Sequence, residues 1–570
     1  MKVRINEKEY EFQESKSILD ACSEIGLNLP TLCHHELLEP RGVCRLCVVE
    51  ADGKLVTSCT TKIRDGMSIE THSNKVIESR RMNLMLLIAD HQEECLSCNK
   101  STDCLLFKYA NEYDIHGIPF EKIDKEEFEP DESCYSFRRD LKKCIKCGKC
   151  VEVCNVLQKV YAIEYSKRGK DLKMSTAFEY PINETECTFC GQCVLNCPTC
   201  ALEEKYEASD LMWAINDKET VVACQVAPSV RASIMEEFGK NEGITVGKLV
   251  SALKMIGFDY VFDTQLGADL TIMEEANELL ERIKENKGLP MFTSCCPAWV
   301  KFVEDNFHDF IPNLSSCKSP QQMLASVFRT YFAGKLESKP ENIKLASIMP
   351  CTAKKTEARR YEFIGDIDFV ITTRELSRMI KEFGINFEAL DESEFDCPLG
   401  ESSGAGAIFG VSGGVCEAAL RTAYETATSK KLEKVEFEQI RGVDFFKHGE
   451  ININGRVVRF AVVHTLGKAR ELLEQIRKGE AHYDFVEVMA CPGGCIGGGG
   501  QPIPTDMKTI RERMQRLYTI DQLKKARRSH ENPDIIRIYG EFLEQPLSKK
   551  AHALLHTKYM KRSYYSDKKG

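Results

Sequence analysis

The sequence predicts a multidomain protein of mixed α+β and α/β class, with small cysteine-rich units ahead of one large α/β domain. Three observations predict this organisation. The chain has 570 residues, more than one ordinary hydrophobic core holds together. It contains 27 cysteines, most of them in groups whose spacing is typical of metal ligands. After about residue 209, these groups give way to alternating amphipathic helices and short aliphatic strands.

The first unit is expected to span residues 1–78 and to be a small α+β fold. Residues 2–12 alternate in polarity around a tight turn near Asn6 and Glu7, which predicts a hairpin. Ser15 or Ser17 then caps a helix over residues 18–25 that stops at Gly26.

Four cysteines follow this predicted helix: Cys33, Cys44, Cys47 and Cys59. Three ligands in one region and a more distant fourth are typical of plant-type sites, so we expect a 2Fe–2S cluster on a β-grasp, ferredoxin-like domain. The ten residues between Cys33 and Cys44 exceed the gap of plant ferredoxins and resemble the variant found in multi-cluster enzymes. A zinc site is the alternative.

The second unit, residues 79–125, is expected to be a small His/Cys domain with one 4Fe–4S cluster. A predicted helix over residues 75–90 is followed by His91, Cys95, Cys98 and Cys104. Three cysteines supply three corners of a cubane, and an imidazole can bind the fourth iron. A zinc site with three cysteines and one histidine is the alternative.

The third unit, residues 126–208, contains a duplicated motif of the bacterial two-cluster ferredoxin type. The spacing Cys-x₂-Cys-x₂-Cys-x₃-Cys occurs twice, the second time directly before Pro198. In this pattern the fourth cysteine of each run binds the other cluster. We therefore assign one 4Fe–4S cluster to Cys144, Cys147, Cys150 and Cys197, and another to Cys187, Cys190, Cys193 and Cys154.

Composition narrows the setting and the partners. The start of the chain has no hydrophobic export segment, and the longest aliphatic run, Leu84–Ile88, is too short to cross a bilayer. Thiols that are not exported stay reduced, so we expect metal ligands rather than disulfides, and a cytoplasmic location. The formal net charge of −10 argues against nucleic acid and anionic membranes as partners.

The fourth unit, residues 209–570, is predicted to be a large two-lobed α/β domain with a helical tail from about residue 520. Helices are expected over residues 248–255 and 272–285, and buried strands over residues 260–263, 344–349 and 369–372. Loops that follow such strands are where α/β enzymes place their chemistry.

Three separated segments of this domain carry cysteines in an unusual setting: residues 293–299, 349–357 and 487–502. Together they supply Cys296, Cys351, Cys491 and Cys495, which could close one cubane buried between the lobes. The run Gly497–Gly500 would let the backbone approach a bulky cofactor, because glycine has no Cβ. A mobile turn is the alternative interpretation of that run.

These three segments resemble the signature motifs of the iron–iron (FeFe) hydrogenases. They read Thr-Ser-Cys-Cys-Pro-Ala-Trp, Met-Pro-Cys-Thr-Ala-Lys-Lys-Thr-Glu and, for the third, the glycine-rich run after Cys491 and Cys495. With the cluster motifs ahead of them, essentially the whole chain resembles the clostridial multi-cluster form of that family. Its N-terminal third also resembles the large iron–sulfur subunit of respiratory complex I. The resemblance implies an H-cluster, in which a cubane is bridged by one cysteine to a di-iron subsite with carbon monoxide, cyanide and azadithiolate ligands. One 2Fe–2S and three accessory 4Fe–4S clusters would accompany it.

The resemblance also assigns roles around this cofactor. All four cysteines would bind the cubane, and Cys495 would bridge to the di-iron subsite as well. Buried cyanide ligands need hydrogen-bond donors, which we expect from Lys354 and from the pair Pro228 and Ser229. The side chains expected to pack against the subsite are Met349, Met489, Phe409 and Gln321.

Cys295 neighbours a predicted ligand, but the family does not use it as one. A thiol with a reference pKa of about 8.5 can donate a proton to the bridgehead amine of the subsite and recover it. The resemblance continues this proton path through Glu275, Ser315, Glu278 and Arg282. Because Glu275 and Glu278 lie three residues apart on one helix face, where like charges repel, a solvated face is the alternative.

The expected activity is the reversible reduction of protons to dihydrogen. Ferredoxin, or flavodoxin, would supply electrons through the accessory clusters, and separate maturation proteins would install the di-iron subsite in what is expected to be a monomer. A hydrogen sensor, an iron–sulfur assembly scaffold and an electron-transfer subunit are the other candidate classes. Cys295 and the complete lysine and glycine motifs argue against the first two, and only the N-terminal third supports the last.

Overall fold

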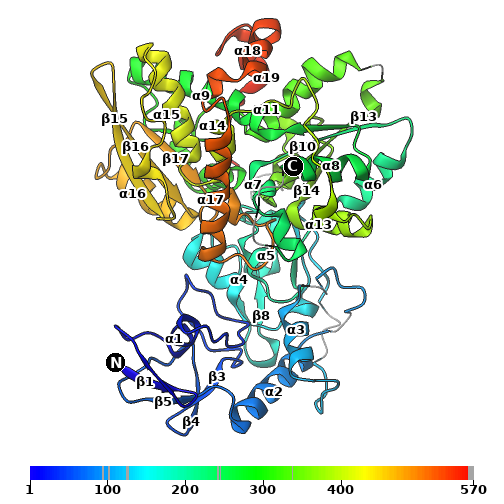
Figure 1. Cartoon of the computed structure of the whole chain (residues 1–570), viewed down its shortest axis with the longest axis vertical. Helices are drawn as coiled ribbons and strands as arrows, with labels where there is room; N and C mark the ends of the chain where they lie inside the picture. The colour runs from blue at the N-terminus through cyan, green and yellow to red at the C-terminus, as the bar shows by residue number, and fades with distance from the viewer. Residues whose placement is uncertain are drawn as a thin grey trace.

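The chain folds into a smaller N-terminal part and a larger C-terminal body. The computed structural model describes residues 1–92, 95–100, 103–123, 128–240, 243, 246–336 and 338–562. Figure 1 shows the N-terminal part, in blue, below a body that contains two sheets, with the cyan segment of α4 and α5 between them. Within the described ranges, no helix combines the length and the apolar character that a membrane span requires.

The N-terminal part contains a five-stranded mixed sheet with the order β2-β1-β5-β3-β4. Its strands are β1 (Lys2–Ile5), β2 (Lys8–Glu11), β3 (Val48–Ala51), β4 (Lys54–Thr57) and β5 (Ser68–Glu70). Asn6 and Glu7 both have positive φ and close the β1–β2 hairpin where the sequence predicts a turn. Ser17 caps helix α1 (Ile18–Glu24) by accepting a hydrogen bond from the backbone of Asp20, and the helix packs on the sheet through a shared apolar core.

Two helices, α2 (Asn74–Ala89) and α3 (Leu105–Glu112), frame the histidine-containing segment. Ser73 caps α2 with its side chain, so the helix begins one residue earlier than predicted. Leu84 of α2 and Leu106 of α3 share a small core with Cys33 and Cys44. The helices that frame the second cysteine group therefore pack against two cysteines of the first group.

The duplicated cysteine motif folds into two equivalent short helices, α4 (Lys149–Glu152) and α5 (Gln192–Asn196). Each begins after a glycine in the left-handed conformation, Gly148 at φ 76° and Gly191 at φ 70°. Two short antiparallel pairs flank them: β6 (Phe137–Arg139) with β9 (Leu202–Glu204), and β7 (Glu164–Ser166) with β8 (Lys173–Ser175). The repeated sequence thus produces a repeated local structure.

Two four-stranded sheets, each with its own buried core, organise the larger body. The first is all-parallel, with the order β11 (Tyr260–Asp263), β10 (Val221–Val226), β13 (Ile343–Met349) and β14 (Phe369–Thr372). The second has the order β12 (Met291–Phe292), β17 (Phe485–Met489), β16 (Arg456–His464) and β15 (Phe446–Ile453), and only β15 runs antiparallel to its neighbour. The three strands predicted from apolar runs match β11, β13 and β14 to within one residue.

Helices cover these sheets: α6 (Ala208–Asn216), α7 (Pro228–Arg231), α8 (Val246–Ile256), α9 (Thr264–Glu285), α10 (Pro297–Asn306), α11 (Pro320–Val327), α12 (Ala353–Glu357), α13 (Thr373–Glu382), α14 (Gly404–Ala407), α15 (Gly414–Thr428) and α16 (Leu466–Arg477). The predicted start of α9 at residue 272 was wrong, because Asp263 caps the helix directly after β11. Gly267 lets α9 lie against α11, since a Cβ there would come 2.2 Å from the carbonyl oxygen of Pro320.

The end of the chain wraps around the larger body. Its helices are α17 (Met507–Leu523), α18 (Pro533–Ile538) and α19 (Lys549–Leu555). After α19, His556 forms an isolated antiparallel bridge with Cys317, and the Tyr559 hydroxyl donates to the carbonyl of Cys317 at 3.1 Å. These contacts fasten the tail to the loop that carries Ser315.

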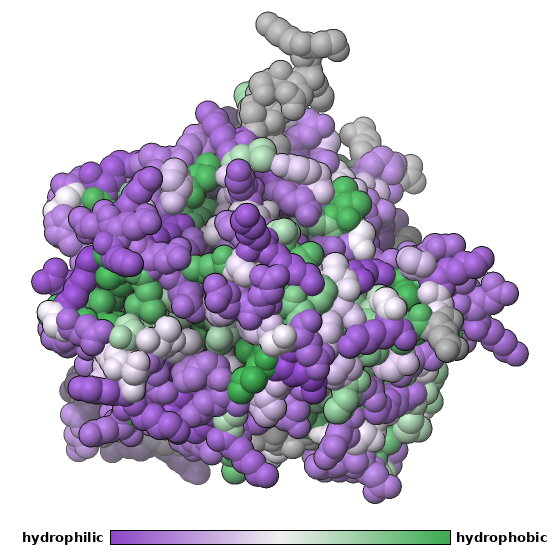
Figure 2. Space-filling view, turned by 90° about the horizontal axis from the view of Figure 1, so that it is seen from above, coloured by the Kyte–Doolittle hydropathy of each residue, from purple (hydrophilic) through white to green (hydrophobic). Residues whose placement is uncertain are grey.

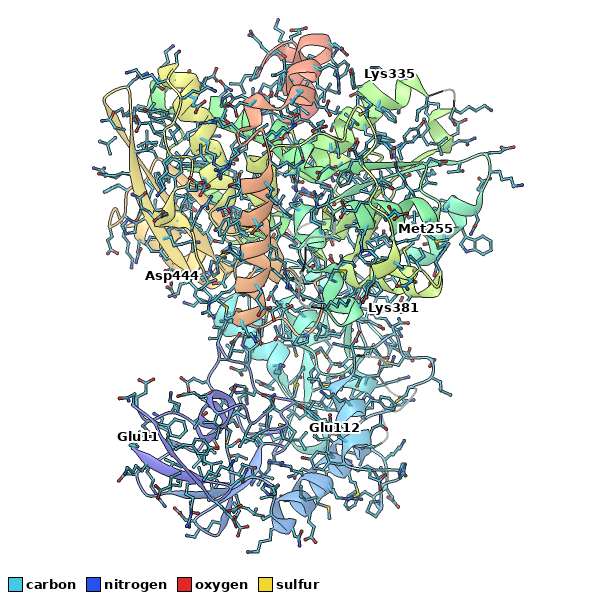
Figure 3. All side chains as sticks on the ribbon, viewed as in Figure 1. Glu11, Glu112, Met255, Lys335, Lys381 and Asp444 are labelled. Atoms are coloured by element: carbon cyan, nitrogen blue, oxygen red, sulfur yellow. The ribbon has the colours of Figure 1, made fainter. Side chains whose placement is uncertain are left out.

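Polar side chains dominate the face of the molecule that Figure 2 shows. The face in Figure 2 is largely hydrophilic and carries only small, separate apolar groups. Figure 3 shows charged side chains such as Glu11, Glu112, Lys335 and Lys381 on the outside of both parts.

Candidate catalytic site

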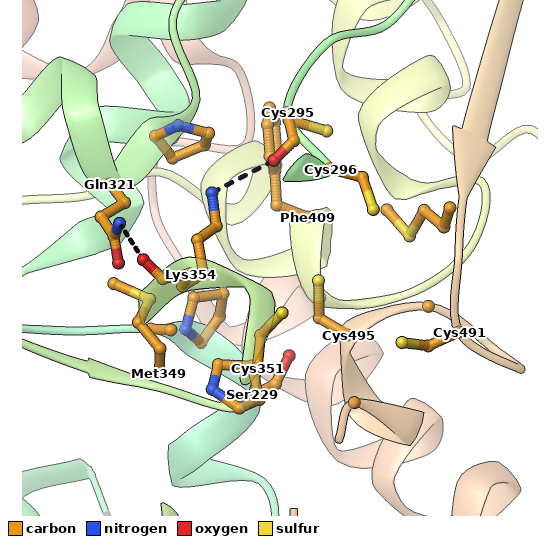
Figure 4. Close-up of a pocket in the computed structure, with 18 of the residues that line it drawn as sticks. Ser229, Cys295, Cys296, Gln321, Met349, Cys351, Lys354, Phe409, Cys491 and Cys495 are labelled. Carbon is orange, nitrogen blue, oxygen red and sulfur yellow. Dashed lines mark hydrogen bonds between the residues drawn. The ribbon is translucent and has the colours of Figure 1, made fainter. Parts of the chain in front are cut away.

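One cavity in the larger body collects four cysteines from three separated segments of the sequence. Cys296, Cys351, Cys491 and Cys495 all line it. Figure 4 shows their thiols gathered around a common space, close to Cys295. The fold thus provides four sulfur ligands in one place, while their binding of a single cubane stays a prediction.

The cavity forms where loops from the two sheets meet. Cys351 follows β13 and Cys491 follows β17, each two residues beyond the strand, and Cys296 precedes α10 after β12. Loops at the carboxyl ends of parallel strands are a common place for functional groups. Gly494, at φ 98°, turns the chain toward Cys495. No side chain fits at this position, because a Cβ would lie 2.8 Å from the sulfur of Met489.

Two polar groups of the cavity fit a cofactor with anionic ligands. The ammonium of Lys354 donates to the carbonyl of Cys295 at 3.2 Å and to the Glu357 carboxylate at 2.8 Å. Burial opposes this charge, but Glu357 outweighs burial and raises the pKa of Lys354 above its ordinary value. The hydroxyl of Ser229 lines the same cavity, is fully buried, and has no hydrogen-bond partner in the described part of the chain. A buried hydroxyl without a partner is costly and indicates an acceptor that belongs there.

All six side chains expected around the di-iron subsite line this one cavity: Pro228, Ser229, Gln321, Met349, Phe409 and Met489. Figure 4 shows Met349 and Gln321 on the side of Lys354, and Phe409 behind Cys295. The Gln321 amide donates to the carbonyl of Lys354 at 3.4 Å and to Glu357 at 3.1 Å. The apolar walls and the few fixed donors together fit the predicted subsite.

Cys295 and Glu275 are both held in their protonated forms. Burial, and next the nearby Glu275 carboxylate, raises the pKa of the Cys295 thiol well above its ordinary value. Burial, and next the Glu278 carboxylate, raises the pKa of Glu275 to about 8. Near neutral pH, both groups can therefore donate a proton.

The remaining predicted path residues form a continuous hydrogen-bonded chain. The Ser315 hydroxyl donates to Glu278 at 2.8 Å, and the Arg282 guanidinium donates to the other oxygen of Glu278 at 2.7 Å. The Arg282 side chain is 17% exposed, whereas Glu275 and Ser315 are fully buried. The chain thus leads from the buried hydroxyl of Ser315 toward the surface, and among the described residues no hydrogen bond joins it to the carboxylate of Glu275.

The structure also brings together three of the four accessory ligand groups. In the first, Cys33 and Cys44 lie with their sulfurs 3.4 Å apart, and Cys47 and Cys59 share a small core. Cys144, Cys147, Cys150 and Cys197 line one cavity, which is the grouping that the crossed ligation predicts. In the last group, burial raises the pKa of Cys187, and the neighbouring Cys154 and Cys190 raise it further, as expected for thiols in contact. Cys193 packs in the same core.

The histidine group is assembled only in part. His91, Cys95 and Cys104 line one cavity, but Cys98 does not appear among its described lining residues. A hydrogen bond from Cys200 lowers the pKa of Cys98 to about 6, so Cys98 lies beside Cys200 instead. His91 Nδ1 lies 2.9 Å from the carbonyl of Lys143. Because a carbonyl only accepts, the proton belongs on Nδ1, and Nε2 is the nitrogen that can bind iron.

Glu357 is a site residue to which the sequence analysis gave no role. Besides Lys354 and Gln321, it accepts a hydrogen bond from Ser319 at 3.0 Å. It thereby fixes both the ammonium and the amide that line the cavity. Its spacing of three residues from Lys354 within α12 was the available signal, because such pairs share a helix face.

Family comparisons cover most of the chain. Residues 220–499 match the family described as iron only hydrogenase large subunit, C-terminal domain, and residues 507–562 match the iron hydrogenase small subunit. Residues 1–74 match a 2Fe-2S iron-sulfur cluster binding domain. Residues 80–119 match the NADH-ubiquinone oxidoreductase-G iron-sulfur binding region, and residues 143–201 match a 4Fe-4S dicluster domain.

Individual relatives match over nearly their whole length. The chain is 44% identical to the NADP-reducing hydrogenase subunit HndD of Solidesulfovibrio fructosivorans, over 98% of this chain and 99% of the relative. It is 40% identical, with the same coverage, to iron hydrogenase 1 of Clostridium pasteurianum. A solved structure concerned with stepwise assembly of the FeFe-hydrogenase H-cluster covers 63% of this chain and 99% of its own, at a TM-score of 0.57 and 42% identity.

Proposed function

Because the chain belongs to the iron-only hydrogenases, we propose that it interconverts protons and dihydrogen at an H-cluster held in the cavity of the larger body. The observation that carries this proposal is the convergence of Cys296, Cys351, Cys491 and Cys495 on one buried cavity. A protonated thiol, Cys295, lies beside it, and the unsatisfied hydroxyl of Ser229 lines it.

In this proposal the four cysteines would bind the cubane, and Cys495 would also hold the di-iron subsite, which would carry carbon monoxide, cyanide and azadithiolate ligands. The bound cofactor would supply the redox chemistry at hydrogen. Lys354 and Ser229 would hold its anionic ligands by hydrogen bonds. Met349, Met489 and Phe409 would exclude water from it.

Cys295 would give up its proton to the bound cofactor and regain one from Glu275. Its raised pKa supports this role, because a thiol that ionised at neutral pH would have no proton to give. Ser315, Glu278 and Arg282 would then relay protons from the surface along their hydrogen bonds. In hydrogen oxidation the same residues would carry protons outward.

The accessory cofactors in this proposal are one 2Fe–2S cluster and three 4Fe–4S clusters. The five-stranded sheet with α1 supports a β-grasp domain at the start of the chain, and the equivalent helices α4 and α5 support a two-cluster ferredoxin domain. Maturation proteins would install the di-iron subsite. The predicted domain boundaries, monomeric state and cytoplasmic location stay predictions.

Two classes of electron partner are compatible with this activity. Ferredoxin, or flavodoxin, is the first, since an internal relay needs only a small one-electron carrier. A nicotinamide-linked partner subunit is the second, and one specific observation favours it: the relative HndD is named as a subunit of an NADP-reducing hydrogenase.

Protein matured with its di-iron subsite and assayed with reduced viologen tests the activity. We expect hydrogen evolution, together with infrared bands of metal-bound carbonyl and cyanide that the unmatured protein lacks. Intact iron–sulfur spectra without hydrogen evolution would contradict the proposal.

The electron partner can be tested with the same matured protein. Hydrogen evolution driven by reduced ferredoxin would support the first class of partner. Evolution that requires NADPH and a further subunit would support the second.

A further inference from the structure

The two-cluster segment meets the larger body through a contact between two glycine backbones. Gly191 follows Cys190, and Gly499 belongs to the glycine run after Cys495. A Cβ on Gly499 would lie 2.7 Å from the Cα of Gly191 and 2.8 Å from the carbonyl oxygen of Cys190. A Cβ on Gly191 would lie 3.1 Å from the Cα of Gly499 and 2.1 Å from the hydroxyl of Thr352. Neither position has room for a side chain.

Hydrogen bonds on both sides hold this contact closed. The Thr352 hydroxyl donates to the carbonyl of Phe189 at 3.0 Å, and the Gln192 amide donates to the carbonyl of Gly497 at 2.8 Å. The Ser136 hydroxyl reaches the carbonyl of Thr352 at 2.7 Å. All of these residues are buried or nearly so, so water does not compete for the bonds.

A buried ion pair adds a second clamp. Arg374 donates to both carboxylate oxygens of Glu204, at 3.1 and 2.7 Å, and also to the carbonyl of Gly499 at 2.8 Å. Burial alone would raise the pKa of Glu204, but Arg374 and Arg378 outweigh burial and keep it below its ordinary value. The strand β9 of the two-cluster segment is thus tied to the glycine run itself.

The contact lies between two sets of predicted iron ligands. Cys190 directly precedes Gly191, and Cys351 directly precedes Thr352. Cys190, Cys296 and Cys351 pack against the same hydrophobic core. In Figure 1, α5 lies at the junction between the lower part and the larger body.

We propose that the Gly191–Gly499 contact sets the gap across which electrons pass between the accessory cluster at Cys190 and the cubane of the catalytic site. This inference rests on the proposed function. The step is the transfer of an electron that oxidises one cluster and reduces the other, and it forms and breaks no bond. Because electron tunnelling weakens steeply with the width of the gap, a methyl group inserted here would slow it. Gly191 and Gly499 act as positioning residues.

Gly499→Ala is the sharper test, because Gly499, unlike Gly191, does not have a left-handed backbone that alanine would strain. In protein that carries its iron–sulfur clusters but no di-iron subsite, electron paramagnetic resonance should show weaker magnetic coupling between the two reduced clusters than in the wild type. After maturation, the ratio of ferredoxin-driven hydrogen evolution to isotope exchange between dihydrogen and heavy water should fall several-fold. Exchange needs no incoming electrons, so this ratio isolates electron delivery.

Three further variants define the result. Gly334→Ala is the matched control, because nothing lies within 4 Å of its Cβ position, and it should behave as the wild type. Gly500→Ala would press on Thr372 and on the backbone of Cys351 within the larger body, so it should lower exchange and evolution together. Glu204→Gln keeps the size of the side chain, removes the charge that Arg374 clamps, and should weaken the coupling.

Wild-type coupling and a wild-type ratio in both Gly499→Ala and Glu204→Gln would overturn the inference. A wild-type protein that neither evolves hydrogen nor exchanges isotopes would refute the proposed function instead. The coupling measured in unmatured protein still decides the role of the glycine contact in that case.

Discussion

Cys295, Glu275 and Lys354 all keep their protons, but for different reasons. Burial disfavours the ionised forms of Cys295 and Glu275, and a neighbouring acidic group raises the pKa of each residue further. Burial also disfavours the charged form of Lys354, and the Glu357 carboxylate contributes most to reversing that effect and raising its pKa. The protonated thiol of Cys295 and the ammonium of Lys354 line the same cavity, whereas Glu275 is not among its described lining residues.

Replacing Cys295 by alanine should stop proton delivery without removing the metal site. General acid–base groups contribute on the order of 100-fold or more, so we expect hydrogen evolution by Cys295→Ala to fall by at least about 100-fold. The spectra of the iron–sulfur clusters should be retained. Cys224→Ala is the control, because Cys224 is a buried thiol of β10 that lies outside the cavity lining. Wild-type evolution in Cys295→Ala would contradict the proton path.

Glu275 should make the stability of the protein depend on pH. Its pKa is raised from 4.5 to about 8, so its contribution to stability is fully present below pH 4.5 and is lost as the pH rises through 8. Glu275→Gln removes this loss. We expect the difference in thermal midpoint between the variant and the wild type to increase from about pH 5 to about pH 8. The corresponding difference in the free energy of unfolding should approach roughly 5 kcal/mol. The exposed Glu281, replaced by glutamine, is the control. A midpoint difference that stays constant over this range would argue against a raised pKa.

At the scale of elements, α9 connects the first sheet to the proton path. It is capped by Asp263, the last residue of β11, and carries Glu275, Glu278 and Arg282 in its second half. Asp263 both caps the helix and forms a fully buried ion pair with Arg231 at 2.7 Å. The orientation of the path therefore depends on one carboxylate at the other end of the helix.

Asp263→Ala should be strongly destabilising, because it leaves the Arg231 guanidinium buried without its partner. Loss of one member of a buried pair costs about 3–5 kcal/mol, whereas loss of an ordinary helix cap such as Ser73 costs about 1 kcal/mol. Hydrogen exchange followed by mass spectrometry measures both losses, because it follows α9 in the larger body and α2 in the N-terminal part separately. Asp263→Asn keeps an acceptor for the cap, so its loss of stability should lie between those of Asp263→Ala and Ser73→Ala. Equal losses for Asp263→Ala and Ser73→Ala would contradict the structural role of the pair.

At the scale of the whole molecule, the parts differ in what holds them together. The two sheets of the larger body have extensive apolar cores. The two-cluster segment has α-helices of four and five residues and strands of three, which are too short to be stable alone, and its apolar residues belong to a core that it shares with the second sheet. Cluster binding and folding should therefore be coupled in that segment.

Removal of iron by a strong chelator under reducing conditions should loosen the two-cluster segment before the larger body. Hydrogen exchange followed by mass spectrometry is expected to show faster exchange over residues 137–204, with protection retained in β10, β13 and α9. Untreated protein is the control. The same loss of protection in both parts would mean that the larger body also depends on iron.

The sequence alone determined the local units of this protein. The hairpin of β1 and β2, the cap of α1 and the strands β11, β13 and β14 follow from turn chemistry, capping residues and apolar runs that act over a few positions. The grouping of the duplicated cysteines was equally accessible, because their short spacing limits the geometry. The start of α9 could not be predicted from the sequence. Its first turns are buried on all sides, so they have no amphipathic pattern that would mark a helix.

Tertiary structure decided how these units meet. No spacing in the sequence brings Cys296, Cys351 and Cys491 together, because the two sheets that carry them must first pack against each other. The same holds for the unsatisfied hydroxyl of Ser229, the raised pKa of Glu275 and the glycine contact between Gly191 and Gly499. Burial and contact between distant segments create these properties, and both exist only in the folded chain.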